Sequence, residues 1–295
     1  MQGRATAPAA GTVLNALATG TGAAFAIDAD TTASVALDAT AGGDATVEGS
    51  VAGAPDADTA LVERCVELAV DRWAADADVD PSAVGGEVHT ESDVPMAAGL
   101  KSSSAAANAT VLATASALDA DPDPLEACRI GVRAARDAGV TVTGAFDDAS
   151  ASMLGGLTVT DNRADELLAH EPVDWDVLVW TPPERAYSAD ADVARCEQVA
   201  PIARLVADLA TAGDHGRAMT VNGLAFCAAL EFPTDPIVDA LPDATGVSLS
   251  GTGPSYVAVF DPDGDDDRDA VAARWRDRDG DVWRTTTRSD GARIL

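Results

Sequence analysis

Lysine is almost missing from this 295-residue sequence: Lys101 is the only one, against 18 arginines. Acidic residues number 49, of which 38 are Asp, and the formal net charge is −30. They are spread along the whole chain, which favours a halophilic protein, because the Debye length is only about 3 Å at 1 M salt. A basic face is lacking too, and this absence excludes nucleic acid as a partner.

Long apolar runs and clustered cysteines are also lacking. Asp, Arg or Gly interrupts every apolar stretch, so no membrane span is predicted. Residues 1–20 lack the apolar core of a signal peptide, and we expect a cytoplasmic protein. The cysteines are far apart in sequence, at Cys65, Cys128, Cys196 and Cys227, and the three histidines show no ligand spacing. Reduced core cysteines are therefore favoured over a zinc site.

The hydrophobic pattern predicts an α+β protein with two domains, one over residues 1–170 and one over 171–295. In the first, AFAIDAD and ASVALDAT are typical of two strands joined by turn-forming Asp and Thr. The Ala-rich run up to Leu118 is predicted as a helix, and Asp123 with Pro124 predicts the start of another. In the second, the order strand, helices, strand, strand, helix, strand matches a ferredoxin-like unit.

The most informative segment is a loop rich in Gly and Ser at 95–105. A strand before it and a helix after it place backbone N–H groups and the positive end of a helix dipole at the turn, where anions bind. Gly99 lets the backbone approach a phosphate, and Ser102–Ser104 offer hydroxyls to phosphate or Mg²⁺. Lys101, retained here alone, suggests a task that needs a compact ammonium; a solvated Lys at a helix start is the alternative.

The same loop carries a family resemblance. It reads Pro95-Met96-Ala97-Ala98-Gly99-Leu100-Lys101-Ser102-Ser103-Ser104-Ala105. It resembles the second motif of the GHMP kinases, P-x-x-x-G-L-x-S-S-x-A, at every fixed position, and Lys followed by three serines is similar to the archaeal shikimate kinases. Segments 7–16 and 249–255 resemble the first and third GHMP motifs. The resemblance implies that residues 95–105 bind ATP, with Ser103 as the candidate ligand of Mg²⁺.

Two adjacent carboxylates, Asp147 and Asp148, lie among small and apolar residues, which indicates partial burial. The run resembles the catalytic segment of mevalonate-type kinases, in which an Asp precedes a Gly-Gly pair. Counting back from Gly155-Gly156 selects Asp148 as the base, which we prefer, whereas aligning on the following Ala selects Asp147. An Asp beside the attacking hydroxyl can accept its proton. A carboxylate would also be needed to hold Mg²⁺, and the sequence does not decide between Glu126 and Asp137 for this role.

The resemblance implies a two-domain GHMP kinase fold and the ATP-dependent phosphorylation of a small-molecule hydroxyl, in this case shikimate to shikimate 3-phosphate on the route to chorismate and aromatic amino acids. Homoserine kinase and mevalonate kinase are alternatives, but Asp148 counts against the first and Lys101 against the second. A non-catalytic metabolite sensor of this fold is a third alternative. Arg4, Arg185 and Arg217 are unranked candidates for binding the acceptor carboxylate, and no oligomeric state is predicted.

The net charge generates a first testable prediction. We expect the protein to lose stability as ionic strength falls, because repulsion among the acidic groups is then less screened. Thermal melts in molar and in millimolar KCl measure this directly. An unchanged or higher melting temperature at low salt would contradict the halophilic interpretation.

Overall fold

The computed structural model describes residues 1–39, 45–95, 97–186 and 191–295, and within them the strands form a seven-stranded and a four-stranded sheet. The first sheet contains β1 (Gln2–Leu14), β2 (Thr21–Asp38), β3 (Val47–Val51), β4 (Gly85–Ser92), β5 (Leu157–Asp161), β6 (Glu166–Glu171) and β11 (Arg293–Ile294). Its order is β11-β1-β2-β4-β3, and β5 pairs with β2 and β6. Among the strand pairs that the described residues form, β3 with β4 is the parallel one.

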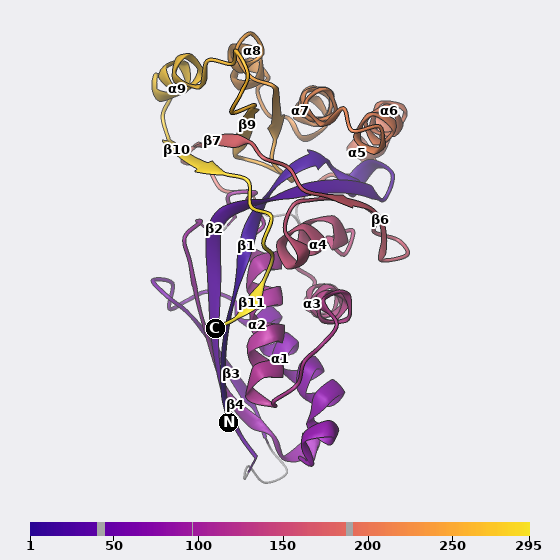
Figure 1. The fold of residues 1–295 in the computed structure, drawn as a ribbon, viewed down its shortest axis with the longest axis vertical. Coiled ribbons are helices and arrows are strands. Elements are labelled where there is room, and N and C mark those ends of the chain that lie inside the picture. The colour runs from indigo at the N-terminus through magenta and orange to yellow at the C-terminus, as the bar shows by residue number, and fades with distance from the viewer. Residues whose placement is uncertain (40–44, 96, 187–190) are drawn as a thin grey trace.

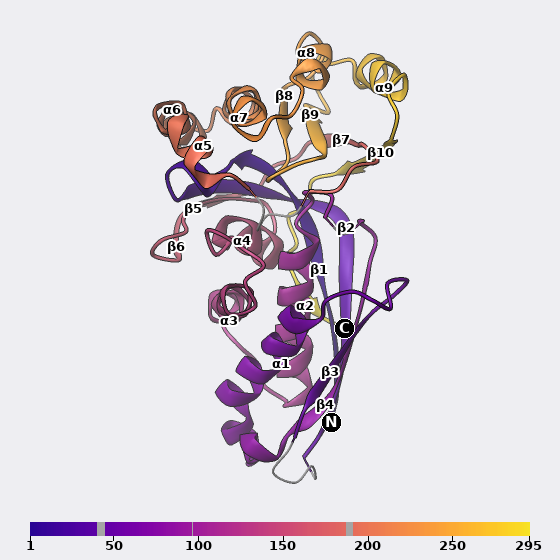
Figure 2. The same ribbon diagram turned by 180° about the vertical axis from the view of Figure 1, so that it is seen from behind.

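Four helices cover one face of the first sheet, as both views of the fold show (Figures 1 and 2). They are α1 (Ala60–Trp73), α2 (Ser102–Ala117), α3 (Pro124–Asp137) and α4 (Phe146–Leu154). The predicted cap of α3 is confirmed, because the Asp123 side chain accepts a hydrogen bond from the Glu126 N–H. No helix in the described part of the chain is long and apolar enough to cross a bilayer.

Small residues let α2 pack tightly against β1. Alanines fill much of α2, and most of its positions are buried. A Cβ added at Gly3 would lie 2.0 Å from the carbonyl oxygen of Ala113, so the strand and the helix backbone approach closely there. This packing fixes the start of α2 against the first sheet, and the Gly/Ser loop ends at that start.

The second sheet has the ferredoxin-like arrangement that the sequence predicted. Its strands are β7 (Asp176–Thr181), β8 (Gly246–Leu249), β9 (Tyr256–Phe260) and β10 (Asp281–Thr286), in the order β10-β7-β9-β8 and all antiparallel. Its helices are α5 (Val193–Gln198), α6 (Ala200–Thr211), α7 (His215–Leu230), α8 (Asp235–Ala240) and α9 (Arg268–Arg276). They form the end of the molecule opposite the N-terminus (Figure 1).

The two sheets share part of their core. One buried cluster combines Val13 and Phe25 of the first sheet with Met219 and Phe226 of α7 and Val257 of β9. Burying such side chains contributes about 1.5–3 kcal/mol each. The shared cluster holds the end of β1 against the second sheet, and the residues that follow β1 therefore reach the glycine turn after β8.

One strand prediction is wrong: AFAIDAD and the first six residues of ASVALDAT lie in a single strand, β2, which ends at Asp38, rather than in two strands joined by a turn. Thr40, the last residue of the second segment, lies outside the described residues. Asp28 and Asp30 do not turn the chain, because both lie within reach of the Arg288 guanidinium, at 3.7 and 2.6 Å. The Thr31 hydroxyl is in turn bonded to the Ser92 hydroxyl on β4 at 2.8 Å. Partners distant in sequence thus overrode a local turn signal.

The division at residue 170 stays a prediction, although it falls at the end of β6, between the last hairpin of the first sheet and β7. After β10 the chain crosses back to the first sheet. There β11 pairs with β1, with Ala5 opposite Ile294 and Thr6 opposite Arg293. The segment from 287 to 295 therefore belongs spatially with the first sheet.

Candidate active site

The Gly/Ser loop leads from β4 into α2 and is fastened to the turn after β8. The Ser250 hydroxyl donates to the Gly99 carbonyl at 2.8 Å, and the Ser255 N–H donates to the Ala98 carbonyl at 3.3 Å. Gly99 has φ +79°, and an added Cβ would lie 2.4 Å from the Ser250 carbonyl oxygen. Glycine is thus required at this position both by its conformation and by the close approach of the turn.

The predicted loop residues differ in exposure. Pro95 and Ser103 are exposed, Ala97, Gly99 and Ser102 are half-buried, Ala98, Leu100, Ser104 and Ala105 are buried, and Met96 lies outside the described residues. The first turn of α2 has no acidic residue, whereas those of α3 and α4 do. Since Asp is so frequent in this chain, the acid-free start leaves the positive end of the helix dipole available to an anion.

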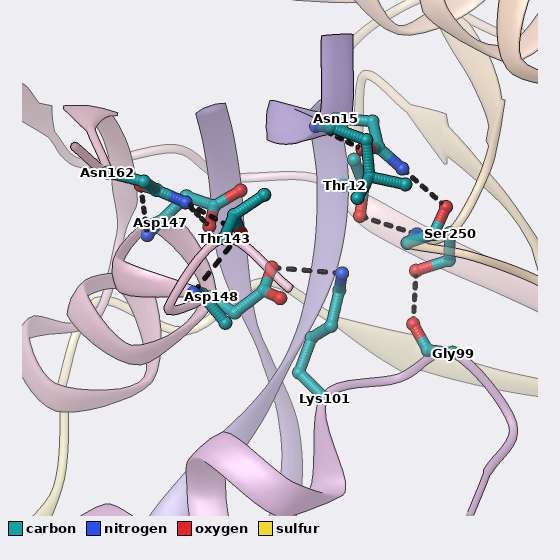
Figure 3. A network of polar contacts seen from close by, with 12 residues as sticks. Thr12, Asn15, Gly99, Lys101, Thr143, Asp147, Asp148, Asn162 and Ser250 are labelled. Atoms are coloured by element: carbon teal, nitrogen blue, oxygen red, sulfur yellow. Dashed lines mark hydrogen bonds and ion pairs between the residues drawn. The ribbon is translucent and has the colours of Figure 1, made fainter. Parts of the chain in front are cut away.

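Lys101 lies at the start of α2 in the left-handed conformation, with φ 64°. Its side chain is 9% exposed, and its Nζ lies 2.9 Å from Oδ1 of Asp148. In Figure 3 the Lys101 side chain extends from the loop toward the aspartates, with the turn containing Ser250 on its other side. The alternative interpretation of Lys101, a solvated side chain at a helix start, is therefore wrong.

The two aspartates occupy the first turn of α4 but have different surroundings. Asp147 is 4% exposed, accepts a hydrogen bond from the Asn162 side-chain N–H at 2.7 Å, and donates its own N–H to Asn162 Oδ1 at 3.0 Å. Asp148 instead faces Lys101 (Figure 3). Of the two adjacent carboxylates, only Asp148 is in an ion pair with Lys101 among the contacts of the described residues.

Burial, together with the negative charge of Asp148, raises the pKa of Asp147 to about 7, although Lys101 and the Asn162 hydrogen bond oppose the rise. An added Cβ at Gly22 would lie 2.2 Å from Asp147 Oδ2, so β2 closes over this carboxyl. Asp147 is thus a buried carboxyl clamped by Asn162, which is the surrounding expected of a group that holds the start of α4 in place.

The first GHMP-like motif reaches the same place from the end of β1. The Thr12 hydroxyl accepts from the Gly251 N–H, and the Asn15 side-chain N–H donates to the Gly251 carbonyl, both at 2.8 Å. The Asn15 backbone N–H also donates to the Asn222 side chain of α7 at 2.9 Å. All three motifs, distant in sequence, are therefore joined by direct hydrogen bonds (Figure 3).

A cavity lies where these segments meet. Its lining comes from the three motifs, the acid pair and the segment before α4: Thr12, Asn15, Ala16, Leu17, Lys101, Thr141, Val142, Thr143, Ala145, Asp147, Asp148, Gly251 and Thr252. Lys101 and the two aspartates are the ionisable residues of this lining. The arrangement sets an ammonium beside the Gly/Ser loop and a carboxylate in the lining of the cavity.

Some of the sequence candidates do not reach the cavity. Glu126 and Asp137 lie on α3, where they pair with Arg72 and Arg64 of α1, at 2.7 and 2.8 Å. Arg4, Arg185 and Arg217 are absent from the cavity lining; Arg4 pairs with Glu91 and Arg217 with Asp214. Within the described ranges, no group of three or more His, Cys, Asp and Glu side chains is placed to hold a metal.

Four polar residues were missed by the sequence interpretation. Thr12 and Asn15 both lie within the first motif, residues 7–16, so that motif carried a signal for them. Asn162 follows β5 and Asn222 lies in α7, and each is buried with its amide engaged. Nothing in their local sequence marks either asparagine, because their partners are 15 and 207 residues away.

This chain is similar to known proteins in both sequence and fold. Residues 60–156 match the family described as GHMP kinases N terminal domain. The shikimate kinase of Halobacterium salinarum is 64% identical over 99% of both chains. That of Methanosarcina acetivorans is 49% identical over 88% of this chain and 85% of its own.

A solved structure extends the likeness to the fold. The homoserine kinase of Cytophaga hutchinsonii superposes with a TM-score of 0.74 at 16% identity, covering 100% of this chain and 97% of its own. The predicted fold class is confirmed. This chain therefore belongs to the GHMP kinases, in the family that includes the two archaeal shikimate kinases.

The pKa of Asp147 generates a second prediction. In the unfolded chain this carboxyl should titrate near 3.8, and in the folded protein near 7. Between these values the folded state binds the extra proton, so stability should fall as the pH rises from about 4 to 7. Asp147→Asn keeps the shape of the side chain but cannot ionise. The stability of this variant should therefore not show this decrease between about pH 4 and 7.

Chemical denaturation of the parent and of Asp147→Asn at several pH values in molar KCl measures the difference. Asp161→Asn is the matched control, because Asp161 lies at the end of β5 and is only half-buried, whereas Asp147 is buried. A parent and an Asp147→Asn variant with parallel stability profiles would contradict a raised pKa at Asp147.

Proposed function

We propose that this protein transfers the γ-phosphoryl group of ATP to a hydroxyl of shikimate, giving ADP and shikimate 3-phosphate. Membership of the kinase family implies the use of ATP, and the relatives at 64% and 49% identity are both shikimate kinases. A single observation carries the catalytic part of the proposal. The chain's one Lys and one of two adjacent Asp residues form a 2.9 Å ion pair in the cavity where the three motifs meet.

The loop and the start of α2 would hold the phosphates of ATP. Their backbone N–H groups lie at an acid-free helix start, and Lys101 adds a positive charge that can move toward the transferred group. Mg²⁺ usually binds one or two protein oxygens besides phosphate and water, and the exposed Ser103 hydroxyl in this first turn fits as one of them. When bound, the ion would neutralise phosphate charge.

Asp148 would act on the acceptor. Its carboxylate lies in the cavity, where it can orient the attacking hydroxyl and accept its proton while the phosphorus–oxygen bond to ADP breaks. The ion pair with Lys101 holds this carboxylate toward the loop. Asp147 would have a supporting role, since its carboxyl is buried and held by Asn162.

The alternatives are less well supported. A sensor would not need a carboxylate and an ammonium held together in a cavity, and this chain keeps both. The likeness to homoserine kinase is at 16% identity and supports the fold alone. We therefore propose shikimate as the acceptor, because both archaeal relatives are named shikimate kinase.

The third prediction tests the reaction and the base together. In a coupled ADP-release assay in molar KCl, shikimate should support turnover, whereas homoserine and mevalonate should not. Asp148→Asn should lower kcat by about 10²–10⁴-fold, the usual contribution of a general base. The Kd for ATP should barely change, because the loop and not Asp148 holds the nucleotide.

Asp147→Asn is the internal control for this assignment and should be much milder. Loss of activity at Asp147 alone would move the base by one residue. Full activity in both variants would reject an Asp base at this place. Binding of shikimate without any ADP release by the parent protein would favour the sensor.

The fourth prediction concerns Lys101. Lys101→Ala should impair turnover strongly, because the transferred phosphoryl group loses a nearby positive charge. Lys101→Arg should rescue only in part, since a planar guanidinium must fit a site where the added Cβ of Gly251 would already lie 2.5 Å from Lys101 Nζ. Steady-state rates with melting curves as a folding check measure both, and parental rates in Lys101→Ala would show the role to be wrong.

A further inference from the structure

The segment from Thr141 to Ala145 forms the wall of the cavity beside the aspartates, and no role has yet been given to it. It connects the end of α3 to α4 and carries two threonines. The Thr141 hydroxyl accepts a hydrogen bond from the Gly144 N–H at 3.1 Å. The Thr143 hydroxyl accepts from the Ala145 N–H at 3.3 Å and from the Asn162 side chain at 3.4 Å.

Each of these hydroxyls therefore acts as an acceptor toward a backbone N–H of its own segment, and Thr143 also toward Asn162. A hydroxyl has one proton to donate and two lone pairs. Among the hydrogen bonds of the described residues, neither proton is donated to a protein group. Two threonines of the cavity wall thus hold their oxygens fixed by backbone N–H groups and keep a donor for a molecule in the cavity.

The chemistry of the acceptor makes these donors significant. Shikimate is a small ring with hydroxyls and a carboxylate, and a carboxylate needs donors or a cation. No Arg is present in the cavity lining that the structure describes, and the one cation, Lys101, is paired with Asp148 beside the phosphate loop. If the carboxylate bound at Lys101, it would compete with the transferred phosphoryl group for the same ammonium.

We propose that residues 141–143 recognise the acceptor, with the Thr141 hydroxyl donating to its carboxylate and the Thr143 hydroxyl to a ring hydroxyl. Thr143 is linked to the buried Asp147 through Asn162, so a carboxylate at Thr143 would face the acid pair. No such link joins Thr141 to the acid pair within the described residues. This inference rests on the proposed function, because it takes shikimate as the acceptor.

Apolar side chains in the same lining suit the ring of such an acceptor. Val142 lies between the two threonines, lines the cavity and is 44% exposed. The half-buried Leu17 lines the cavity from the segment that follows β1. A small carbocycle could cover apolar surface on both while its oxygens face the threonines and Asp148.

The experiment compares Thr141→Val and Thr143→Val with the parent, using shikimate and its methyl ester as acceptors. A hydroxyl that donates to a charged oxygen typically contributes enough to change binding roughly 10- to 100-fold. Thr141→Val should raise the KM for shikimate by about that factor and narrow the preference for shikimate over its ester. Thr143→Val should raise the KM for both acceptors alike, and neither variant should change the KM for ATP.

Two further sets of variants separate recognition from folding. Thr141→Ser and Thr143→Ser keep the hydroxyl and should restore most of the parental KM. Thr211→Val is the matched control, because Thr211 is exposed at the end of α6, where its hydroxyl donates to the Ala207 carbonyl. A variant that merely distorted the α4 start would lower kcat for every acceptor and would not change the preference between acid and ester.

The failures of the two proposals are distinguishable. A parent that turns over shikimate, with both Val variants matching Thr211→Val in KM, would overturn this inference and leave the proposed function standing. An unchanged preference for acid over ester in Thr141→Val would overturn the assignment of the carboxylate. A parent that releases no ADP with shikimate would overturn the proposed function, and this inference with it.

Discussion

The hydrogen bonds between the Gly/Ser loop and the turn after β8 are the constraint on which the site depends. Gly99 lies against the backbone of Ser250. The next residue of the turn, Gly251, is hydrogen-bonded to Thr12 through its N–H and to Asn15 through its carbonyl. These bonds join the end of β1, the start of α2 and the second sheet at one point. Together with the packing of α2, they fix the direction of the loop, from which Lys101 extends toward Asp148.

Buried amides extend this constraint into both halves of the molecule. Asn222, fully buried in α7, accepts from the Asn15 N–H and donates to the Ser248 hydroxyl. Asn162 does the equivalent for α4 by holding Asp147. Loss of one partner would leave a buried polar group unsatisfied, at a cost of about 1–3 kcal/mol. Each asparagine therefore holds a residue of the cavity in position: Asn222 holds Asn15, and Asn162 holds Asp147.

Much of the fold and the centre of the site could be predicted from the sequence, because their signals are local. The Ala-rich stretch of α2, the Asp123 cap and the element order of the second sheet are all written in neighbouring residues. The sequence left two adjacent candidates for the base, Asp148 and Asp147, and preferred Asp148. In the structure, Asp148 lies opposite Lys101. The continuous β2 could not be predicted, because Arg288, more than 250 residues away, pairs with the aspartates that resemble a turn.

The return of the chain to its first sheet has a consequence for the order of folding. β1 pairs on one edge with β2, which is near in sequence, and on the other with β11, from which it is separated by almost the whole chain. The segment between β10 and β11 also bonds to Ala26 and Gly156, so it bridges β2 and the end of α4. Contacts between such distant segments form slowly because a long loop must close first. During synthesis on the ribosome, the part of the β1 edge at Ala5 and Thr6 therefore stays unpaired until residues 293–294 have been made. The acidic, self-repelling surface would help to keep that open edge from pairing with other chains.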